Sequence, residues 1–112
     1  MNRTLIRMLP AGFLFAAAMA LFAFPVHVRA DGAAVYKTKC AGCHAANGAG
    51  DTAAGKALKV RDLRSPDVQK QSDAELTAII TDGKNKMPAY KGKLDDGQIK
   101  SLVGYVRELA KK

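Results

Sequence analysis

The run Cys40-Ala41-Gly42-Cys43-His44 constrains this chain more than any other feature of its sequence. It places two thiols three residues apart and an imidazole directly after the second thiol. On a helical turn, each thiol can add to one vinyl group of a haem, and the next residue presents its imidazole to the iron. The pattern therefore predicts one covalently attached haem c, with Cys40 and Cys43 as the links and His44 as an iron ligand.

Three other interpretations of the motif fit the sequence less well. A thioredoxin-like redox motif belongs to a βαβ setting, and no segment of this chain alternates convincingly as a strand. A structural zinc site needs four ligands, whereas residues 31–112 offer only Cys40, Cys43 and His44. A plain disulfide is common in exported chains, but it leaves the adjacent histidine unexplained.

The first thirty residues have the organisation of a secretory signal. Arg3 and Arg7 precede an apolar stretch over residues 11–24, and Pro25 and a small-residue site ending at Ala30 follow. We expect residues 1–30 to be a cleaved signal peptide and residues 31–112 to form one domain. An uncleaved anchor is the alternative, although the apolar run is shorter than the ~20 residues of a span. Export to the periplasm fits the motif, because bacteria attach haem covalently outside the cytoplasm.

The chain that remains after cleavage has little material for a core. It has 82 residues, and all four phenylalanines lie in the signal, so Tyr36, Tyr90 and Tyr105 are its only aromatic residues. Domains of this size often need stabilisation beyond their own hydrophobic core, and a large apolar cofactor would provide it. Its 15 basic and 10 acidic residues give a formal charge of +5, which favours acidic partners. The lysines are spread along the chain without interleaved aromatics, so we expect no nucleic-acid partner.

Helix signals predict an all-α fold of about four helices. Residues 31–39 form a first helix with Asp31 as its cap, and Ser65-Pro66 begins a second. A capping box at Ser72 begins a third helix that should end at Gly83, and a fourth begins near Asp95. Glycines in residues 45–59 indicate a loop, and residues 84–93 form another.

The second axial ligand of the iron follows by elimination. His44 is the only histidine of residues 31–112, and Met87 is the only methionine. Methionine often fills gaps in cores, but Met87 lies in a loop beside a proline, without apolar periodicity. A Met/His pair is a known haem ligation that raises the reduction potential. Lys84, Lys86 and Tyr90 are weaker alternatives.

With these motifs together, residues 31–112 resemble the class I cytochromes c over essentially their whole length. The resemblance implies one haem enclosed by helices, with the N- and C-terminal helices crossing. Small bacterial and photosynthetic members are the most similar, especially the cytochrome c6 group, which can replace plastocyanin. One departure is that residues 51–54 lack the proline whose carbonyl, in many relatives, accepts a hydrogen bond from the axial histidine. The likeness rests on Gly32, Tyr36, the cysteine motif, Asn47-Gly48-Ala49-Gly50, Gly55-Lys56, Lys86-Met87-Pro88-Ala89-Tyr90, Leu102 and Tyr105.

An iron held on both faces has no open position for a small-molecule substrate. We therefore expect a monomeric, soluble single-electron carrier rather than an enzyme, which shuttles electrons between membrane or soluble redox proteins with acidic docking surfaces. The periplasm is the expected compartment, or the thylakoid lumen in a photosynthetic cell. The alternatives are a peroxidase or gas-binding haem protein with a displaceable methionine, a haem subunit of a larger complex, and a thiol–disulfide protein. Five lysines are expected near the exposed haem edge: Lys39, Lys84, Lys86, Lys91 and Lys93.

Overall fold

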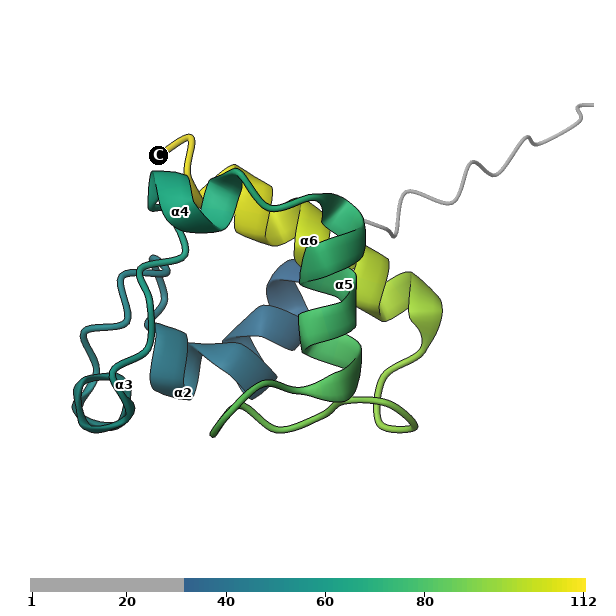
Figure 1. Cartoon of the computed structure of the whole chain (residues 1–112), viewed down its shortest axis with the longest axis horizontal. Helices are drawn as coiled ribbons and strands as arrows, with labels where there is room; N and C mark the ends of the chain where they lie inside the picture. Colours follow the sequence, from purple (N-terminus) through teal and green to yellow (C-terminus); the bar gives the residue numbers. More distant parts are fainter. Residues whose placement is uncertain (1–31) are drawn as a thin grey trace, which may run out of the picture.

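A computed structural model describes residues 32–112 of the chain, and in this part every regular element is helical (Figure 1). The expected signal peptide and the expected cap at Asp31 lie outside the described residues. No helix of residues 32–112 has both the length and the apolar character needed to cross a membrane. The elements are a helix through residues 32–35 that continues as η1 (Tyr36–Cys40) and α2 (Ala41–His44), then α3 (Ala53–Leu58), α4 (Pro66–Gln69), α5 (Asp73–Asp82) and α6 (Asp96–Leu109).

The first helix is longer than the sequence suggested. It was expected to end at Lys39, but helical structure continues through the cysteine motif to His44. Residues Tyr36–Cys40 form a π-helical turn, and the backbone N–H of Ala41 donates to the carbonyl of Tyr36. Such wide turns occur mostly as single insertions within α-helices, often at functional sites. Here the turn lies immediately before the second helical segment, which carries Cys43 and His44.

The segment over residues 45–59 was predicted to be a loop, and this was wrong for α3. Thr52 caps this helix, because its hydroxyl oxygen accepts a hydrogen bond of 2.9 Å from the backbone N–H of Gly55. A Cβ at Gly55 would collide with the carbonyl oxygens of Cys43 and Gly50. The glycine therefore permits close packing of a helix against the cysteine motif, and it does not mark a loop.

The other helix boundaries match the sequence signals. Ser72 and Glu75 form a reciprocal capping box at α5, and Asp95 and Gln98 form one at α6. Gly83 follows α5 with a φ of 75°, a conformation that favours glycine. Ser65 likewise caps α4, with proline in its first turn. These boundaries fix the loop over residues 84–93 between two well-capped helices.

The first and last helices of the described chain pack closely, as expected for crossing terminal helices. Gly32 lies so near the backbone of Ser101 that a Cβ would overlap its carbonyl group. One turn later, the rings of Tyr36 and Tyr105 are 4.9 Å apart between centroids. Tyr36 and Leu102 belong to a buried core cluster at this contact. The crossing thus fixes the helix that carries the cysteine motif against α6 (Figure 1).

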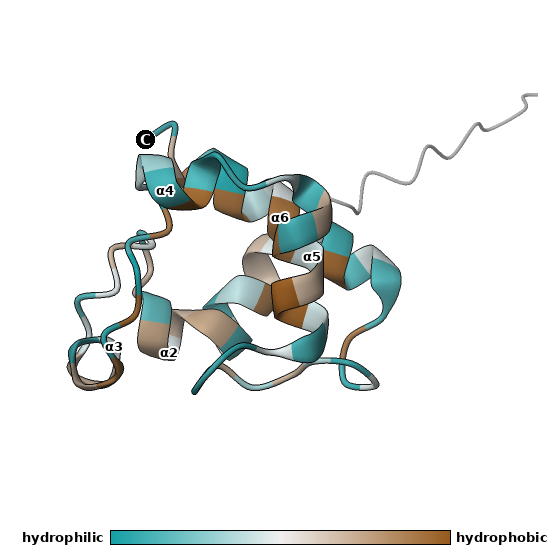
Figure 2. Ribbon diagram, viewed as in Figure 1, coloured by the Kyte–Doolittle hydropathy of each residue, from teal (hydrophilic) through white to brown (hydrophobic). Residues whose placement is uncertain are grey.

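A second core cluster joins α4, α5 and α6. Val68, Leu76, Val103 and Val106 are its buried members. Figure 2 shows hydrophobic residues along α5 and α6, with hydrophilic residues between them. Arg107 links α6 to the neighbouring helices, because its guanidinium donates to the carbonyls of Gln69, at the end of α4, and Gln71, in the turn before α5. These contacts fix α4, α5 and α6 relative to one another.

Candidate haem-binding site

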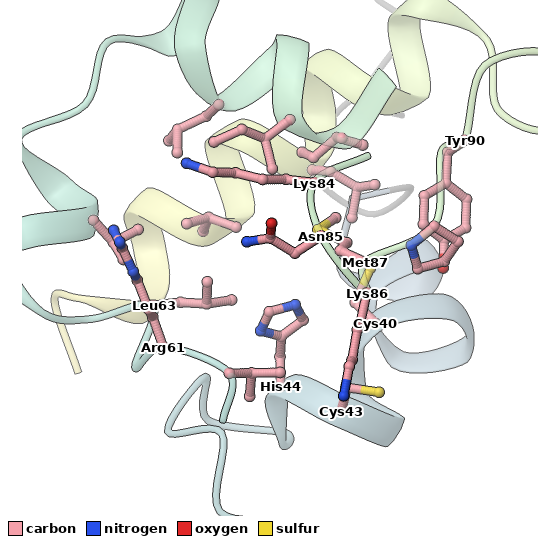
Figure 3. A pocket seen from close by; sticks show the side chains of 18 of the residues that line it. Cys40, Cys43, His44, Arg61, Leu63, Lys84, Asn85, Lys86, Met87 and Tyr90 are labelled. Atoms are coloured by element: carbon pink, nitrogen blue, oxygen red, sulfur yellow. The ribbon is translucent and has the colours of Figure 1, made fainter. Parts of the chain in front are cut away.

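A cavity of about 400 Å³ lies between the cysteine motif, α5, α6 and the loop after α5. Its size is typical of sites for small ligands and cofactors. Cys40, Cys43, His44 and Met87 all line it, so the fold brings together the four residues singled out in the sequence (Figure 3). Much of the remaining wall is apolar and comes from Leu63, Val68, Leu76, Ile79, Ile80, Leu102 and Val106.

The two cysteines are free, partly buried thiols at one side of the cavity. Burial raises the pKa of Cys40 to about 11, so its sulfur is a protonated thiol near neutral pH. Reactive dithiol motifs of disulfide exchange require the opposite, a lowered pKa that supplies thiolate. This environment disfavours the thiol–disulfide interpretation.

His44 is the last residue of α2, and its ring points into the cavity (Figure 3). Burial lowers the pKa of the imidazole, which keeps it neutral and leaves a nitrogen lone pair for a metal. Its Nδ1 atom is buried, and no described residue forms a hydrogen bond with either ring nitrogen. The imidazole is therefore not engaged as a satisfied core histidine.

The backbone around His44 is held by two neighbouring contacts. The buried hydroxyl of Tyr36 donates a hydrogen bond of 2.7 Å to the carbonyl of Ala45, which has a φ of 66°. The N–H of Gly50 donates to the carbonyl of His44 itself, at 2.8 Å. These bonds fix the turn after the motif and thereby the direction of the imidazole.

The loop after the motif binds the motif's backbone rather than the imidazole ring. The hydroxyl of Thr52 lies 2.9 Å from the carbonyl oxygen of Gly42 and 3.1 Å from that of Cys43. In place of the missing proline, another carbonyl of this loop could accept the N–H of His44, but no described residue forms such a bond with Nδ1. Instead, the N–H of Gly50 and the hydroxyl of Thr52 donate to backbone carbonyls at the end of α2.

Met87 is presented by a tight, braced loop. The N–H of Met87 donates to the carbonyl of Lys84 at 2.9 Å, and the N–H of Lys84 donates back at 3.2 Å. Gly83 lies against this turn, where a Cβ would meet the Met87 carbonyl oxygen at 2.7 Å. The N–H groups of Tyr90 and Lys91 then bond the last turn of α5. The backbone that carries the Met87 side chain is thus held beside the cavity by contacts on both sides.

The three alternative ligands are also near this cavity, as are residues that the sequence did not suggest. Lys84, Lys86 and Tyr90 line it, but the Tyr90 hydroxyl donates to the Lys39 carbonyl at 3.1 Å. Asn85 and Arg61 line it as well (Figure 3). Neither belongs to a motif or a periodic pattern, so only the folded arrangement identifies them.

The described residues fit a covalently attached haem. Two thiols and an unengaged imidazole lie on consecutive turns, and a thioether comes from a braced loop at the same cavity. The apolar wall suits the faces of a large macrocycle, which would fill the space left by a small core with few aromatic residues. Such an arrangement would hold iron between a nitrogen and a sulfur donor.

Comparison with known proteins also supports a covalently attached haem. Residues 28–106 match the family model described as cytochrome c oxidase, cbb3-type, subunit III. Cytochrome c6 of Leptolyngbya boryana is 40% identical over 83 residues, covering 74% of this chain and 94% of that protein. Cytochrome c6 of Synechocystis sp. is 35% identical, covering 74% and 67% of the two chains. The solved KustC0563 c-type cytochrome has a TM-score of 0.66 and 32% identity, covering 70% of this chain and 96% of its own.

The chain therefore belongs to the cytochrome c family, as a small class I c-type cytochrome of the c6 type. Its fold is the all-α cytochrome c fold, and its cofactor is one covalently bound haem c with iron. Family membership makes it an electron-transfer protein.

Proposed function

We propose that this protein carries single electrons on a haem c that is bound through Cys40 and Cys43 and ligated by His44 and Met87. The observation that carries the proposal is that all four side chains line one cavity. The cysteines would add their S–H groups across the two vinyl groups, each forming a carbon–sulfur bond while the hydrogen goes to the adjacent carbon. That addition transfers no net electrons and fixes the cofactor in one orientation.

The braced methionine loop supports electron transfer over catalysis. An iron with protein ligands on both faces exchanges an electron with little rearrangement and offers no position to a substrate. The hydrogen bonds between Lys84 and Met87 and the packing at Gly83 oppose displacement of the thioether. A peroxidase or a gas-binding protein would need the opposite, a loop that releases its ligand easily.

Carbon monoxide distinguishes the two kinds of protein. The reduced wild-type protein should bind carbon monoxide weakly or not at all at neutral pH, and Met87→Ala should bind it readily. Lys84→Ala and Lys86→Ala serve as controls, because they test the alternative ligands in the same loop. Ready binding by the wild-type protein, unchanged in Met87→Ala, would favour the haem-enzyme alternative.

For the docking surface, we propose the exposed lysines beside the cavity opening. Lys84, Lys86, Lys91 and Lys93 are exposed on one loop. The hydrogen bond from Tyr90 to the Lys39 carbonyl brings a fifth exposed lysine next to that loop. Such a group attracts redox proteins with acidic docking surfaces and raises their association rate at low salt.

The salt dependence of electron transfer to an acidic redox protein tests this surface. The bimolecular rate should fall as ionic strength rises, and Lys93→Gln should make that fall shallower. Lys56→Gln is the matched control, because Lys56 is equally charged and exposed but lies on α3, outside the proposed lysine group. A rate that is independent of salt, or equal effects of the two variants, would contradict the steering role.

We further propose that residues 1–30 are a signal peptide cleaved on export, and that residues 31–112 act as a soluble monomer in the periplasm or, in a photosynthetic cell, the thylakoid lumen. The sequence pattern of the first thirty residues supports this. The intact mass of haem-loaded protein from an exporting host should correspond to residues 31–112 plus one haem. Retention of the first thirty residues would favour a membrane anchor, and co-elution of the native protein with a larger complex would favour a subunit role.

A further inference from the structure

The charged side chains around the cavity are all of one sign. Among the described residues that line it, five are cationic and none is acidic: Lys39, Lys59, Arg61, Lys84 and Lys86. A cavity with an apolar wall and a cationic rim is suited to a ligand with an apolar body and anionic groups at its edge. Haem has this character, because two propionate carboxylates extend from one edge of the macrocycle.

The cysteines determine which end of the cavity those carboxylates reach. The vinyl groups and the propionates lie on different sides of the rigid ring, so thioether bonds at Cys40 and Cys43 direct the propionates away from the motif. Figure 3 shows Arg61 on the far side of His44 from both cysteines. Arg61 lies on the connection between α3 and α4, at the end of the cavity where a carboxylate edge would emerge.

Arg61 also differs from the other arginines of the described chain in having no protein partner there. Arg64 forms an ion pair of 2.9 Å with Asp62, and Arg107 forms one of 2.9 Å with Asp73. The guanidinium of Arg61 makes neither a hydrogen bond nor an ion pair with any residue of 32–112. An exposed, unpaired guanidinium at a cavity edge has its full set of donors available for a carboxylate.

We propose that Arg61 is a positioning residue for the haem propionates, binding a carboxylate through its guanidinium. This inference rests on the proposed attachment at Cys40 and Cys43, which orients the haem. The pairing restrains the exposed edge of the cofactor and places a fixed positive charge near it. That charge favours the reduced iron, because reduction lowers the positive charge at the centre. Arg61 therefore raises the electron affinity of the haem as well as holding it.

The test compares Arg61→Gln, Arg61→Lys and the control Lys56→Gln as haem-loaded proteins. Arg61→Gln should lower the equilibrium constant for reduction of the iron by roughly two- to fivefold, because it removes one positive charge near the iron in a partly solvated setting. It should also shift the proton NMR signals of the propionate methylene groups more than those of the haem methyl groups. Arg61→Lys should restore most of the equilibrium constant, because it keeps the charge. Lys56→Gln should change neither quantity.

Two results would overturn different parts of the argument. If Arg61→Gln matches Lys56→Gln in reduction equilibrium and in propionate signals, the role of Arg61 is wrong while the proposed function stands. If the wild-type protein carries no haem bound through Cys40 and Cys43, the proposed function fails, and the orientation on which this inference rests fails with it. The absorption of the alkaline pyridine complex of the haem reports that attachment separately.

Discussion

Replacing Tyr36 by phenylalanine removes one buried hydroxyl and leaves the ring in the core. The side chain is only 2% exposed, and its hydroxyl donates to the Ala45 carbonyl at 2.7 Å. The net contribution of such a bond is about 1 kcal/mol, and the Ala45 carbonyl keeps a second donor, the N–H of Gly48 at 3.1 Å, when the hydroxyl is removed. Because one buried hydrogen bond is lost, we expect Tyr36→Phe to lower the free energy of unfolding by about 0.5–1.5 kcal/mol.

The same hydroxyl predicts a pH dependence of stability. Burial raises the pKa of Tyr36 well above its ordinary value of 10.0. An unfolded chain therefore loses this proton from about pH 10 upward, whereas the folded chain keeps it. The stabilisation is complete below pH 10 and is lost as pH rises toward the folded pKa, by about 1.4 kcal/mol per pH unit.

Urea unfolding of the haem-loaded protein at several pH values measures both effects. The difference in unfolding free energy between wild type and Tyr36→Phe should be constant below pH 10 and should shrink above it. Tyr105→Phe is the control, because its ring packs on Tyr36 but its hydroxyl bonds no described residue. A Tyr36→Phe protein as stable as the control, with a difference that does not change across pH 10, would refute the reasoning.

Two glycine substitutions test the packing that positions the site. Gly32→Ala should reduce the free energy of unfolding by about 1–3 kcal/mol, because the new methyl would overlap the backbone of Ser101. Gly104→Ala, on the open face of α6, is the control and should be neutral or stabilising by about 0.5–1 kcal/mol. Thermal or urea unfolding measures both. Equal effects of the two would argue against the close crossing. Gly83→Ala should keep covalent haem but weaken the optical signature of methionine ligation, since its φ of 75° and the nearby Met87 carbonyl exclude a Cβ. An unchanged spectrum would show that this turn does not hold Met87.

Much of the fold could be predicted because its signals are local. The capping boxes at Ser72 and Asp95 each involve residues three apart, and the structure contains both. The α3 helix could not be predicted in the same way. Gly55 lowers the helical propensity of its own segment. The need for a glycine there becomes evident only in the folded structure, where the carbonyl oxygens of Cys43 and Gly50 approach it. Similarly, the π-helical turn before Ala41 has no sequence signature that we recognise.

In the candidate site, too, some residues are identified by local sequence signals and others only by the folded structure. The cysteine motif is contiguous, and the scarcity of histidine and methionine made Met87 stand out, so the two attachment residues and the two ligand candidates were accessible from the sequence. Arg61 was not, because its relation to the cysteines depends on how the chain between α3 and α4 passes the cavity. The lack of a hydrogen-bond partner for Nδ1 of His44 could not be predicted either, because it depends on the tertiary structure. Residues 50–52 bond the backbone of the motif instead.

The most direct test of the central claim is the optical spectrum of the oxidised, haem-loaded protein, compared with that of Met87→Ala. Ligation by His44 and Met87 predicts a weak sulfur-to-iron charge-transfer band in the wild-type protein that disappears in Met87→Ala, while Lys84→Ala and Lys86→Ala retain it. A wild-type spectrum without this band, unchanged by Met87→Ala, would contradict the assignment of a closed, electron-carrying iron.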